Sequence, residues 1–242
     1  MARGLKRRRS GFREPRKYKY AIFSEGLVTE PAYFMGMRYE IEKSAAYKDM
    51  IYVEGAGCDT LRVLAYAQDW IRNNDIKNCH VWCLYDKDDF PENDFNAVVQ
   101  KIAALNVRNA NDKNGITYHA GWSNECFEYW LVLHCKWYFS QNGRQDYERI
   151  LNEIFKEQLG KPYSKVGKDC LGRSDRSAQP LYENMLQIGN PKMAIRYAEK
   201  QMHNLEEELG ENVINKTPSK ALPATRVQEL VKELARYLEP EA

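Results

Sequence analysis

Acidic side chains directly follow two short apolar runs in this chain. Glu25 comes after residues 20–23, and the cluster Asp86, Asp88 and Asp89 comes after residues 80–85. Such runs are typical of strands in a parallel sheet that is buried on both faces. Ligands gather beyond the carboxyl ends of these strands, and carboxylate oxygens are the ligands that Mg²⁺ and Mn²⁺ prefer. The pattern therefore predicts a divalent-metal site that acts on phosphate groups.

The spacing within the acidic cluster allows two interpretations. In an extended segment Asp86 and Asp88 face the same way, roughly 6 to 7 Å apart, whereas Asp89 points elsewhere. On its own, Asp-x-Asp is equally typical of a polar turn that leads into a helix. Glu25 at the end of an earlier strand favours the metal site. Gly26 beside it lets the chain turn sharply and lets a ligand approach the backbone.

The elements that must position these side chains alternate between strand and helix over residues 18–140. We expect strands at 20–23, 50–53, 80–85 and 116–120, and helices at about 31–44, 60–71, 94–105 and 127–138. Strand–helix repetition with short connections is typical of βαβ units. The prediction is an α/β fold in which helices flank a sheet of at least four mainly parallel strands. Glu25 and Asp86 are expected at the carboxyl ends of adjacent strands.

The pattern changes near residue 142, so we divide the chain into three parts. A basic arm covers residues 1–17, the α/β domain covers 18–140, and a helical C-terminal region covers 141–242. Within the last part we expect helices at 180–185, 191–209 and 226–238, and an exposed basic loop at about 160–180.

Composition limits the class of protein. The chain has 242 residues, of which 43% are hydrophobic, enough for one domain with an appended subdomain. No apolar run approaches the ~18 residues that a membrane span needs, and the N-terminus lacks the apolar stretch of a secretory signal. Six cysteines lack paired CxxC spacing, which favours reduced thiols in a cytoplasmic protein over disulfides. A zinc site at Cys79 and Cys83 is the minor alternative.

Positive charge is concentrated at the N-terminus. Residues 1–20 contain nine Lys or Arg and one Glu, a net charge of +8, whereas the rest of the chain has 27 cations and 33 anions, a net charge of −6. A basic arm on an acidic body is typical of a phosphate-binding tail, and its alternative is a solvated leader that aids solubility. The candidate nucleic-acid contacts are Arg7, Arg8, Arg9 and Arg13 in the arm and Lys165, Lys168 and Arg173 in the loop.

The segment after the fourth predicted strand supplies one more candidate. Asn124 has the ordinary role of a helix N-cap, and His134 falls on an apolar helical stripe, which favours a packed histidine over a ligand. Glu128 lies in the first helical turn, where the helix dipole favours a carboxylate. We therefore expect Glu128 to reach the same crevice as Glu25 and Asp86.

Four motifs together resemble the RloB family over nearly the whole chain. They are Glu25-Gly26-x-x-Thr29-Glu30-Pro31, Trp82-Cys83-x-Tyr85-Asp86-x-Asp88-Asp89, Ser123-Asn124-x-x-Phe127-Glu128-x-Trp130 and Pro223-Ala224-Thr225-x-Val227. RloB-like proteins resemble the Toprim superfamily, which includes OLD-type nucleases, primases and topoisomerases. They are associated with bacterial phage defence, as in the AbiL abortive-infection system with its ABC-type ATPase partner.

The resemblance implies a Toprim-like fold and a role for each matching residue. Glu25 matches the Toprim glutamate, and Asp86 and Asp88 match its Asp-x-Asp pair. Several Toprim proteins have an aspartate four residues after the glutamate, where this chain has Thr29, and Glu30 follows one position later. The candidate metal ligands are therefore Glu25, Asp86 and Asp88, with Glu30 and Asp89 as less certain additions. Glu128 joins Glu25, Asp86 and Asp88 as a candidate catalytic residue.

The resulting hypothesis is a Mg²⁺- or Mn²⁺-dependent nuclease of phage defence. The metal would neutralise the scissile phosphate, and Glu25 would bind a second ion or act as a general acid or base. Topoisomerases and primases need further modules for which 242 residues leave no room. The alternative is a non-catalytic nucleic-acid-binding or regulatory subunit of an ATPase-linked defence complex. The substrate, DNA or RNA, and the formation of a homo-oligomer are left open.

Overall fold

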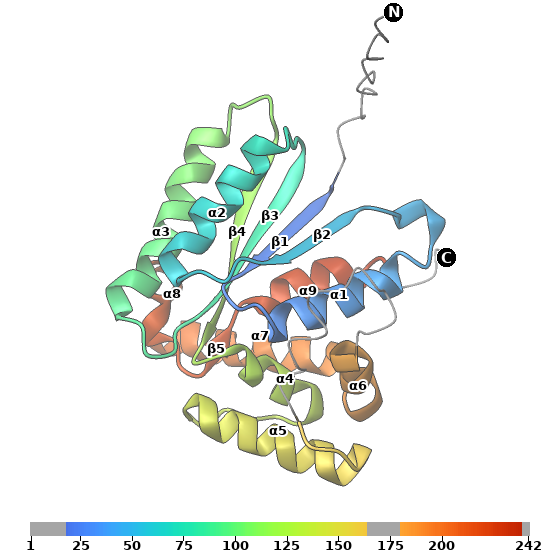
Figure 1. The fold of residues 1–242 in the computed structure, drawn as a ribbon. Helices are drawn as coiled ribbons and strands as arrows, with labels where there is room; N and C mark the ends of the chain where they lie inside the picture. The colour runs from blue at the N-terminus through green and yellow to red at the C-terminus, as the bar shows by residue number, and fades with distance from the viewer. Residues whose placement is uncertain (1–17, 164–179, 239–242) are drawn as a thin grey trace, which may run out of the picture.

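A computed structural model describes residues 18–163 and 180–238 of the chain. Its centre is a five-stranded sheet in the order β2-β1-β3-β4-β5 (Figure 1). The strands are β1 (Tyr20–Ser24), β2 (Ile51–Gly55), β3 (Cys79–Asp86), β4 (Ile116–Asn124) and β5 (Ala224–Thr225). The first four are parallel and β5 pairs antiparallel with β4. The predicted α/β class and mainly parallel sheet are confirmed, and β1 and β3 are adjacent as expected.

Helices cover both faces of the sheet. The helices that follow the first four strands are α1 (Thr29–Ile41), α2 (Thr60–Asn73), α3 (Glu92–Asn109) and α4 (Phe127–Cys135). Those that follow are α5 (Arg144–Leu159), α6 (Pro180–Ile188), α7 (Pro191–Leu209), α8 (Glu211–Lys216) and α9 (Val227–Ala235). Helices α2 and α3 lie on one face, and α1, α4 and α9 lie on the other, with α5 outermost (Figure 1).

Strand periodicity explains how the sheet serves two cores. Along β3, Val81, Cys83 and Tyr85 face the α2–α3 core, while Trp82 and Leu84 face the core beneath α1 and α4. Alternating side chains point to opposite faces, so a run that is apolar on both sides becomes a central strand. Such a strand ends where the first carboxylate, Asp86, appears.

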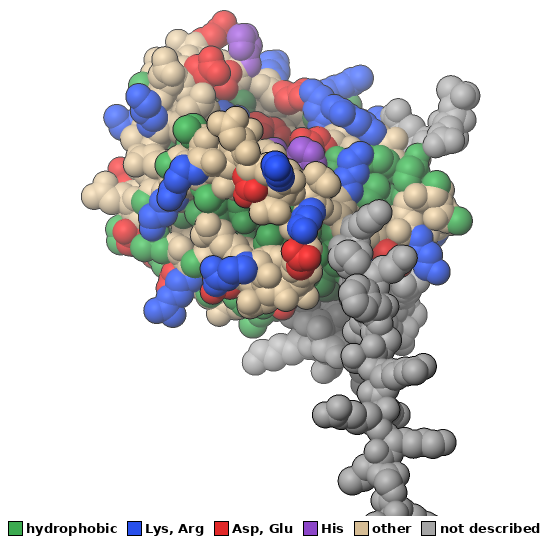
Figure 2. Space-filling view, turned by 90° about the horizontal axis from the view of Figure 1, so that it is seen from above, with side chains coloured by type: hydrophobic (Ala, Val, Ile, Leu, Met, Phe, Trp, Pro, Cys, Tyr) green, Lys and Arg blue, Asp and Glu red, His purple; other side chains and the backbone are tan. Residues whose placement is uncertain are grey.

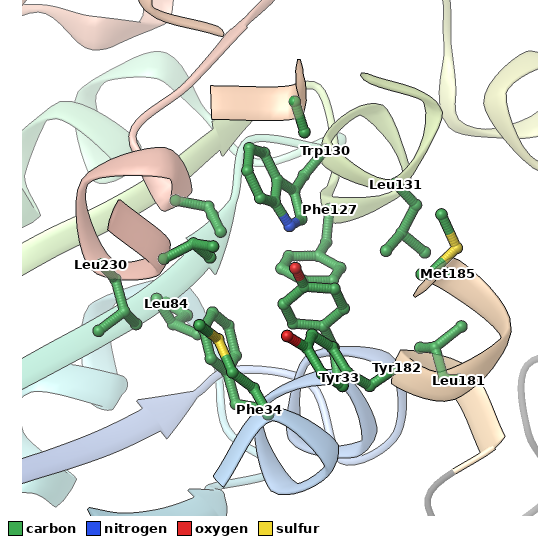
Figure 3. Close-up of a cluster of buried hydrophobic side chains, with 14 of the residues drawn as sticks. Tyr33, Phe34, Leu84, Phe127, Trp130, Leu131, Leu181, Tyr182, Met185 and Leu230 are labelled. Carbon is green, nitrogen blue, oxygen red and sulfur yellow. The ribbon is translucent and has the colours of Figure 1, made fainter. Parts of the chain in front are cut away.

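An aromatic cluster fixes α1 against α4 and α6. Tyr33 of α1 makes edge-to-face contacts with Phe127 and with Tyr182, with ring centroids 5.7 Å and 5.1 Å apart (Figure 3). Edge-to-face contact is one of the favoured arrangements of aromatic rings, so these pairs help to orient the helices as well as burying area. Because α1 and α4 both begin at the carboxyl edge of the sheet, this packing brings their first turns toward each other.

The structure corrects the predicted role of Asn124 and some boundaries. Asn124 is not a helix cap: it ends β4, and its side-chain amide donates to the carbonyls of Pro218, Ser219 and Ala221 at 2.9–3.2 Å. The reason is the loop at 218–221, which returns to the end of β4 from nearly a hundred residues away. Helix α4 ends at Cys135 rather than at 138, and α1 begins at Thr29, with Pro31 in its first turn.

The structure bears on the expectations about membrane-spanning helices and about the cysteines. Among residues 18–163 and 180–238, no helix is long and apolar enough to cross a membrane. The five cysteines in these ranges are free thiols, and Cys79 and Cys83 are both buried.

Candidate functional site

Five carboxylates and one guanidinium line a cavity of about 270 Å³ at the carboxyl edge of the sheet. They belong to Glu25, Glu30, Asp86, Asp88, Glu128 and Arg144. Strands β1 and β3 supply the ends that bear Glu25 and Asp86, and the first turns of α1, α4 and α5 supply Glu30, Glu128 and Arg144. The structure thus brings together all but one of the acidic residues singled out in the sequence.

Glu25 continues the pairing of β1 with β3. Its backbone N–H donates to the carbonyl of Leu84 at 2.9 Å, which fixes the position of its Cα. The Thr60 hydroxyl, at the start of α2, donates to Glu25 Oε2 at 2.9 Å. Burial raises the pKa of Glu25 above its ordinary value, and the nearby charge of Asp88 adds to this, while the bond from Thr60 opposes it.

Asp86 and Asp88 share one cationic partner. Arg144 Nη2 lies 3.0 Å from Asp86 Oδ2 and 2.6 Å from Asp88 Oδ2. Asp86 Oδ2 also accepts from the backbone N–H of Phe127 at 3.2 Å, at the N-terminus of α4. Burial nevertheless raises the pKa of Asp86 well above its ordinary value, and the charges of Glu30 and Glu128 add to this. A single guanidinium therefore leaves the cluster short of positive charge.

Glu30 and Glu128 form the buried wall of the cavity, with 7% and 2% of their surfaces exposed. Burial raises the pKa of Glu30 to about 7, and repulsion from Glu128 contributes. Glu128 accepts from the Tyr163 hydroxyl at 3.3 Å. Gly26 packs against Glu30: a Cβ on Gly26 would lie 2.6 Å from Glu30 Oε2, so a larger residue there would require this carboxylate to shift.

Asp89 does not line this cavity, which counts against its candidate role as a metal ligand. The backbone turns at Asp88, where φ is +37°, and Asp89 directly after it is exposed. The alternation of an extended strand ends there, while Asp86 and Asp88 still reach a common partner.

Arg144 is the functional candidate that sequence reasoning missed. It is the first residue of α5, 58 residues beyond Asp86, and no motif marks it. Its Nε–H is buried and has no hydrogen-bond partner among the described residues. Only the fold places this side chain over the acidic cluster, because Tyr147, one turn along α5, packs on Tyr129 of α4 with ring centroids 5.6 Å apart.

His134 is a packed histidine, as predicted. Its Nδ1–H donates to the Trp130 carbonyl at 3.0 Å, and its Nε2 accepts from the Tyr33 hydroxyl at 3.0 Å. Burial lowers its pKa to about 4, so the ring is neutral at pH 7.

The predicted nucleic-acid contacts lie outside the described residues. They are Arg7, Arg8, Arg9, Arg13, Lys165, Lys168 and Arg173. On the face drawn in Figure 2, the described Lys and Arg side chains are interspersed with Asp and Glu and form no continuous basic patch. Phosphate binding by the arm and the loop stays a prediction.

The metal site also stays a prediction. Within residues 18–163 and 180–238, no three His, Cys, Asp or Glu side chains are arranged to hold one ion. The oxygens of Asp86 and Asp88 are directed at Arg144 instead.

Comparisons with known proteins test the resemblance directly. No curated protein and no solved structure gives a significant match. The family model described as RloB-like protein matches residues 20–234, a span that contains every element of the sheet and the whole cavity. The chain belongs to the RloB-like protein family.

Proposed function

We propose that this protein is a Mg²⁺- or Mn²⁺-dependent nuclease that cleaves phosphodiester bonds in nucleic acid. The observation that carries the proposal is the convergence of Glu25, Asp86 and Asp88 in one cavity at the ends of adjacent parallel strands. Ligand sites of open α/β sheets lie at this edge. Clustered carboxylates repel one another, and a cation offsets this cost.

The donor set fits a hard divalent cation. Every candidate ligand is a carboxylate oxygen, the atom type that Mg²⁺ and Mn²⁺ prefer. Burial raises the pKa values of Glu25, Glu30 and Asp86, and repulsion from neighbouring carboxylates adds to this effect. Glu25, Asp86 and Asp88 would hold the ion, which would neutralise the charge of the scissile phosphate.

The surrounding residues have positioning tasks. Thr60 orients the Glu25 carboxylate, and the Phe127 N–H orients Asp86. Glu25 then either completes the ligand set or accepts a proton from the attacking water. Glu128, held by Tyr163, adds negative charge to the inner wall of the cavity.

The placement of the acidic residues also supports the finer assignment to the Toprim superfamily. Under that assignment Glu25 is the Toprim glutamate at the end of the first strand and Asp86-x-Asp88 is the paired motif on the neighbouring strand. A role in phage defence, together with an ABC-type ATPase partner, rests on the family resemblance and is part of the same proposal.

A cleavage assay with the full chain tests the proposed activity. Purified protein is incubated with Mg²⁺ or Mn²⁺ and with plasmid, single-stranded DNA or total tRNA, with and without the proposed ABC-type ATPase partner. We expect metal-dependent cleavage that Asp86→Asn abolishes. The control Asp69→Asn, on the exposed face of α2, should retain it.

The assay also separates the alternative function. Metal-dependent binding of these substrates without cleavage, in every combination, would favour a non-catalytic nucleic-acid-binding subunit. Cleavage that persists in Asp86→Asn would contradict the proposed site.

A further inference from the structure

Arg144 occupies the position between Asp86 and Asp88 that a ligand shared by both carboxylates would take. One nitrogen, Nη2, contacts both side chains, at 3.0 Å and 2.6 Å. We propose that Arg144 is an exchangeable counter-ion: it holds the two aspartates until a divalent cation displaces it, and its freed guanidinium then binds the substrate phosphate. This inference rests on the proposed metal-dependent function.

The geometry of the contact between Arg144 and the two aspartates favours its exchange for another cation. A fork-to-fork arginine–carboxylate pair uses two parallel N–H bonds, whereas here a single Nη2 serves two carboxylates and Nε–H has no partner among the described residues. A divalent ion carries twice the charge of the guanidinium, so its attraction to the same carboxylates is larger at equal distance. The arginine side chain is 37% exposed, which leaves it a path outward.

The backbone around the cluster stays in place when the side chain leaves. Tyr147 is fully buried against α4 and anchors the first turn of α5, so exchange needs only a rotation about the Arg144 side-chain bonds. Asp86 keeps its bond from the Phe127 N–H. The two aspartates therefore remain positioned for the incoming ion.

Once displaced, the Arg144 guanidinium is suited to bind a phosphate of the substrate. Its planar set of N–H donors matches the oxygens of a phosphate, a geometry that lysine does not offer. Arg144 already lines the cavity, so the phosphate it would contact is one held next to Asp86 and Asp88.

The test measures Mn²⁺ binding to the full chain by titration calorimetry. Arg144→Gln removes the competing charge, and we expect its Mn²⁺ affinity to exceed that of wild type about tenfold, the effect of roughly 1.4 kcal/mol of relieved competition. Arg144→Lys keeps the charge and should stay near wild type. Arg149→Gln, on the same helix but exposed and paired with Asp146 and Glu153, is the matched control and should not change affinity.

A second measurement tests the phosphate contact. It uses fluorescence anisotropy with a short single-stranded DNA whose linkages are phosphorothioates, at saturating Mn²⁺. We expect Arg144→Gln to bind this DNA several-fold more weakly than wild type or Arg149→Gln. Tighter metal binding together with weaker DNA binding is a pair of opposite effects that a general loss of folding does not produce.

The outcomes separate this inference from the proposed function. Equal or weaker Mn²⁺ binding in Arg144→Gln, with binding to wild type intact, overturns the exchange and leaves the metal site standing. Absence of Mn²⁺ binding in both wild type and Arg144→Gln overturns both. Binding that appears only in Arg144→Gln supports the exchange most strongly.

Discussion

At the scale of single residues, the cavity depends on side chains that are themselves uncharged or unreactive. Thr60 is fully buried, and its hydroxyl donates a hydrogen bond to Glu25. Gly26 leaves room for the carboxylate of Glu30, which burial holds at a raised pKa. The acidic groups are thus positioned by neighbours whose own chemistry is limited to one hydrogen bond or to the absence of a Cβ.

Gly26→Ala should displace the Glu30 carboxylate. The added Cβ would lie 2.6 Å from Oε2 and 3.0 Å from Oε1, so the buried carboxylate would have to shift away from Gly26. We expect a loss of about 1–3 kcal/mol in the free energy of unfolding, as for other overpacked sites, measured by urea denaturation. Gly143→Ala is the control for crowding, because a Cβ added there would meet no atom within 4 Å; since Gly143 is the N-cap of α5, it should cost only the capping preference of glycine over alanine, about 1 kcal/mol or less. Equal stability of the two variants would contradict the crowding at Gly26.

Thr60→Val tests the support of Glu25. Valine matches the shape of threonine but cannot donate to Glu25 Oε2, so the buried contact of 2.9 Å is lost. We expect about 1 kcal/mol of lost stability and a weaker Mn²⁺ affinity in calorimetry, because the Glu25 carboxylate is no longer oriented. Thr117→Val, on an exposed position of β4, provides the matched control. Unchanged Mn²⁺ affinity in Thr60→Val would contradict a role for the oriented Glu25 carboxylate in metal binding.

At the scale of elements, the end of β4 is held by a distant loop. Asn124 donates to three carbonyls of residues 218–221, and Ser219 N–H donates back to Asn96 of α3 at 3.0 Å. This loop leads into β5, the antiparallel strand that completes the sheet. The segment that carries Phe127 and Glu128 therefore starts from a point fixed by residues near the C-terminus.

Asn124→Ala should loosen this junction. The change leaves buried carbonyls without their donor, and each lost partner costs about 1–3 kcal/mol, so a loss at the upper part of that range or above is expected. Urea denaturation measures the stability, and hydrogen exchange of residues 218–225 reports the local opening. Asn74→Ala is the control, since its amide bonds only the Trp70 carbonyl at an exposed helix end. Equal costs for the two variants would contradict the anchoring role of Asn124.

The elements also show what sequence patterns could and could not predict. Apolar runs and their alternation with helices predicted the four parallel strands and a helix from about residue 60, where α2 begins with Asp59 as its N-cap. The strand ends then placed Glu25, Asp86 and Asp88 together, because carboxyl ends of adjacent parallel strands meet at one edge. Arg144 and the bonds of Asn124 depend on contacts across 58 and nearly a hundred residues, and no local periodicity encodes such contacts.

At the scale of the whole molecule, stability and charge depend on pH through groups that burial perturbs. His134 has a folded pKa of about 4 against an ordinary value of 6.5. Between these values the unfolded chain binds a proton that the folded chain does not, so the contribution of His134 is present above pH 6.5 and lost as the pH falls toward 4. Glu30 acts in the opposite direction, because its pKa is raised to about 7 and its protonated form favours the folded state below that pH.

His134→Gln isolates the contribution of this histidine to the pH dependence of stability. We expect wild type to lose up to about 3 kcal/mol more stability than the variant when the pH falls from about 7 to 4, because a shift of one pKa unit corresponds to about 1.4 kcal/mol. The difference between the two proteins removes the contribution of Glu30, which both retain. His203→Gln, at an exposed position of α7, should follow wild type. Parallel pH profiles for His134→Gln and wild type would contradict the buried neutral ring.

The distribution of charge leads to the last prediction, which concerns the basic arm. Residues 1–20 carry a net charge of +8 while the rest of the chain carries −6, so under the proposed function the arm, rather than the acidic body, is suited to contact the phosphates. Each phosphate that a cation neutralises releases counterions. The logarithm of the affinity should therefore fall with the logarithm of the salt concentration, with a slope of about −0.7 to −0.9 per phosphate contact. Deleting residues 1–17 should flatten this slope and weaken binding to all sequences, with Mn²⁺ affinity unchanged. Anisotropy titrations over a range of salt concentrations measure it, and replacement of Lys165, Lys168 and Arg173 by Gln serves as the comparison. If the truncated protein keeps the wild-type slope and the loop variant loses it, the 160–180 segment rather than the arm binds the phosphate backbone.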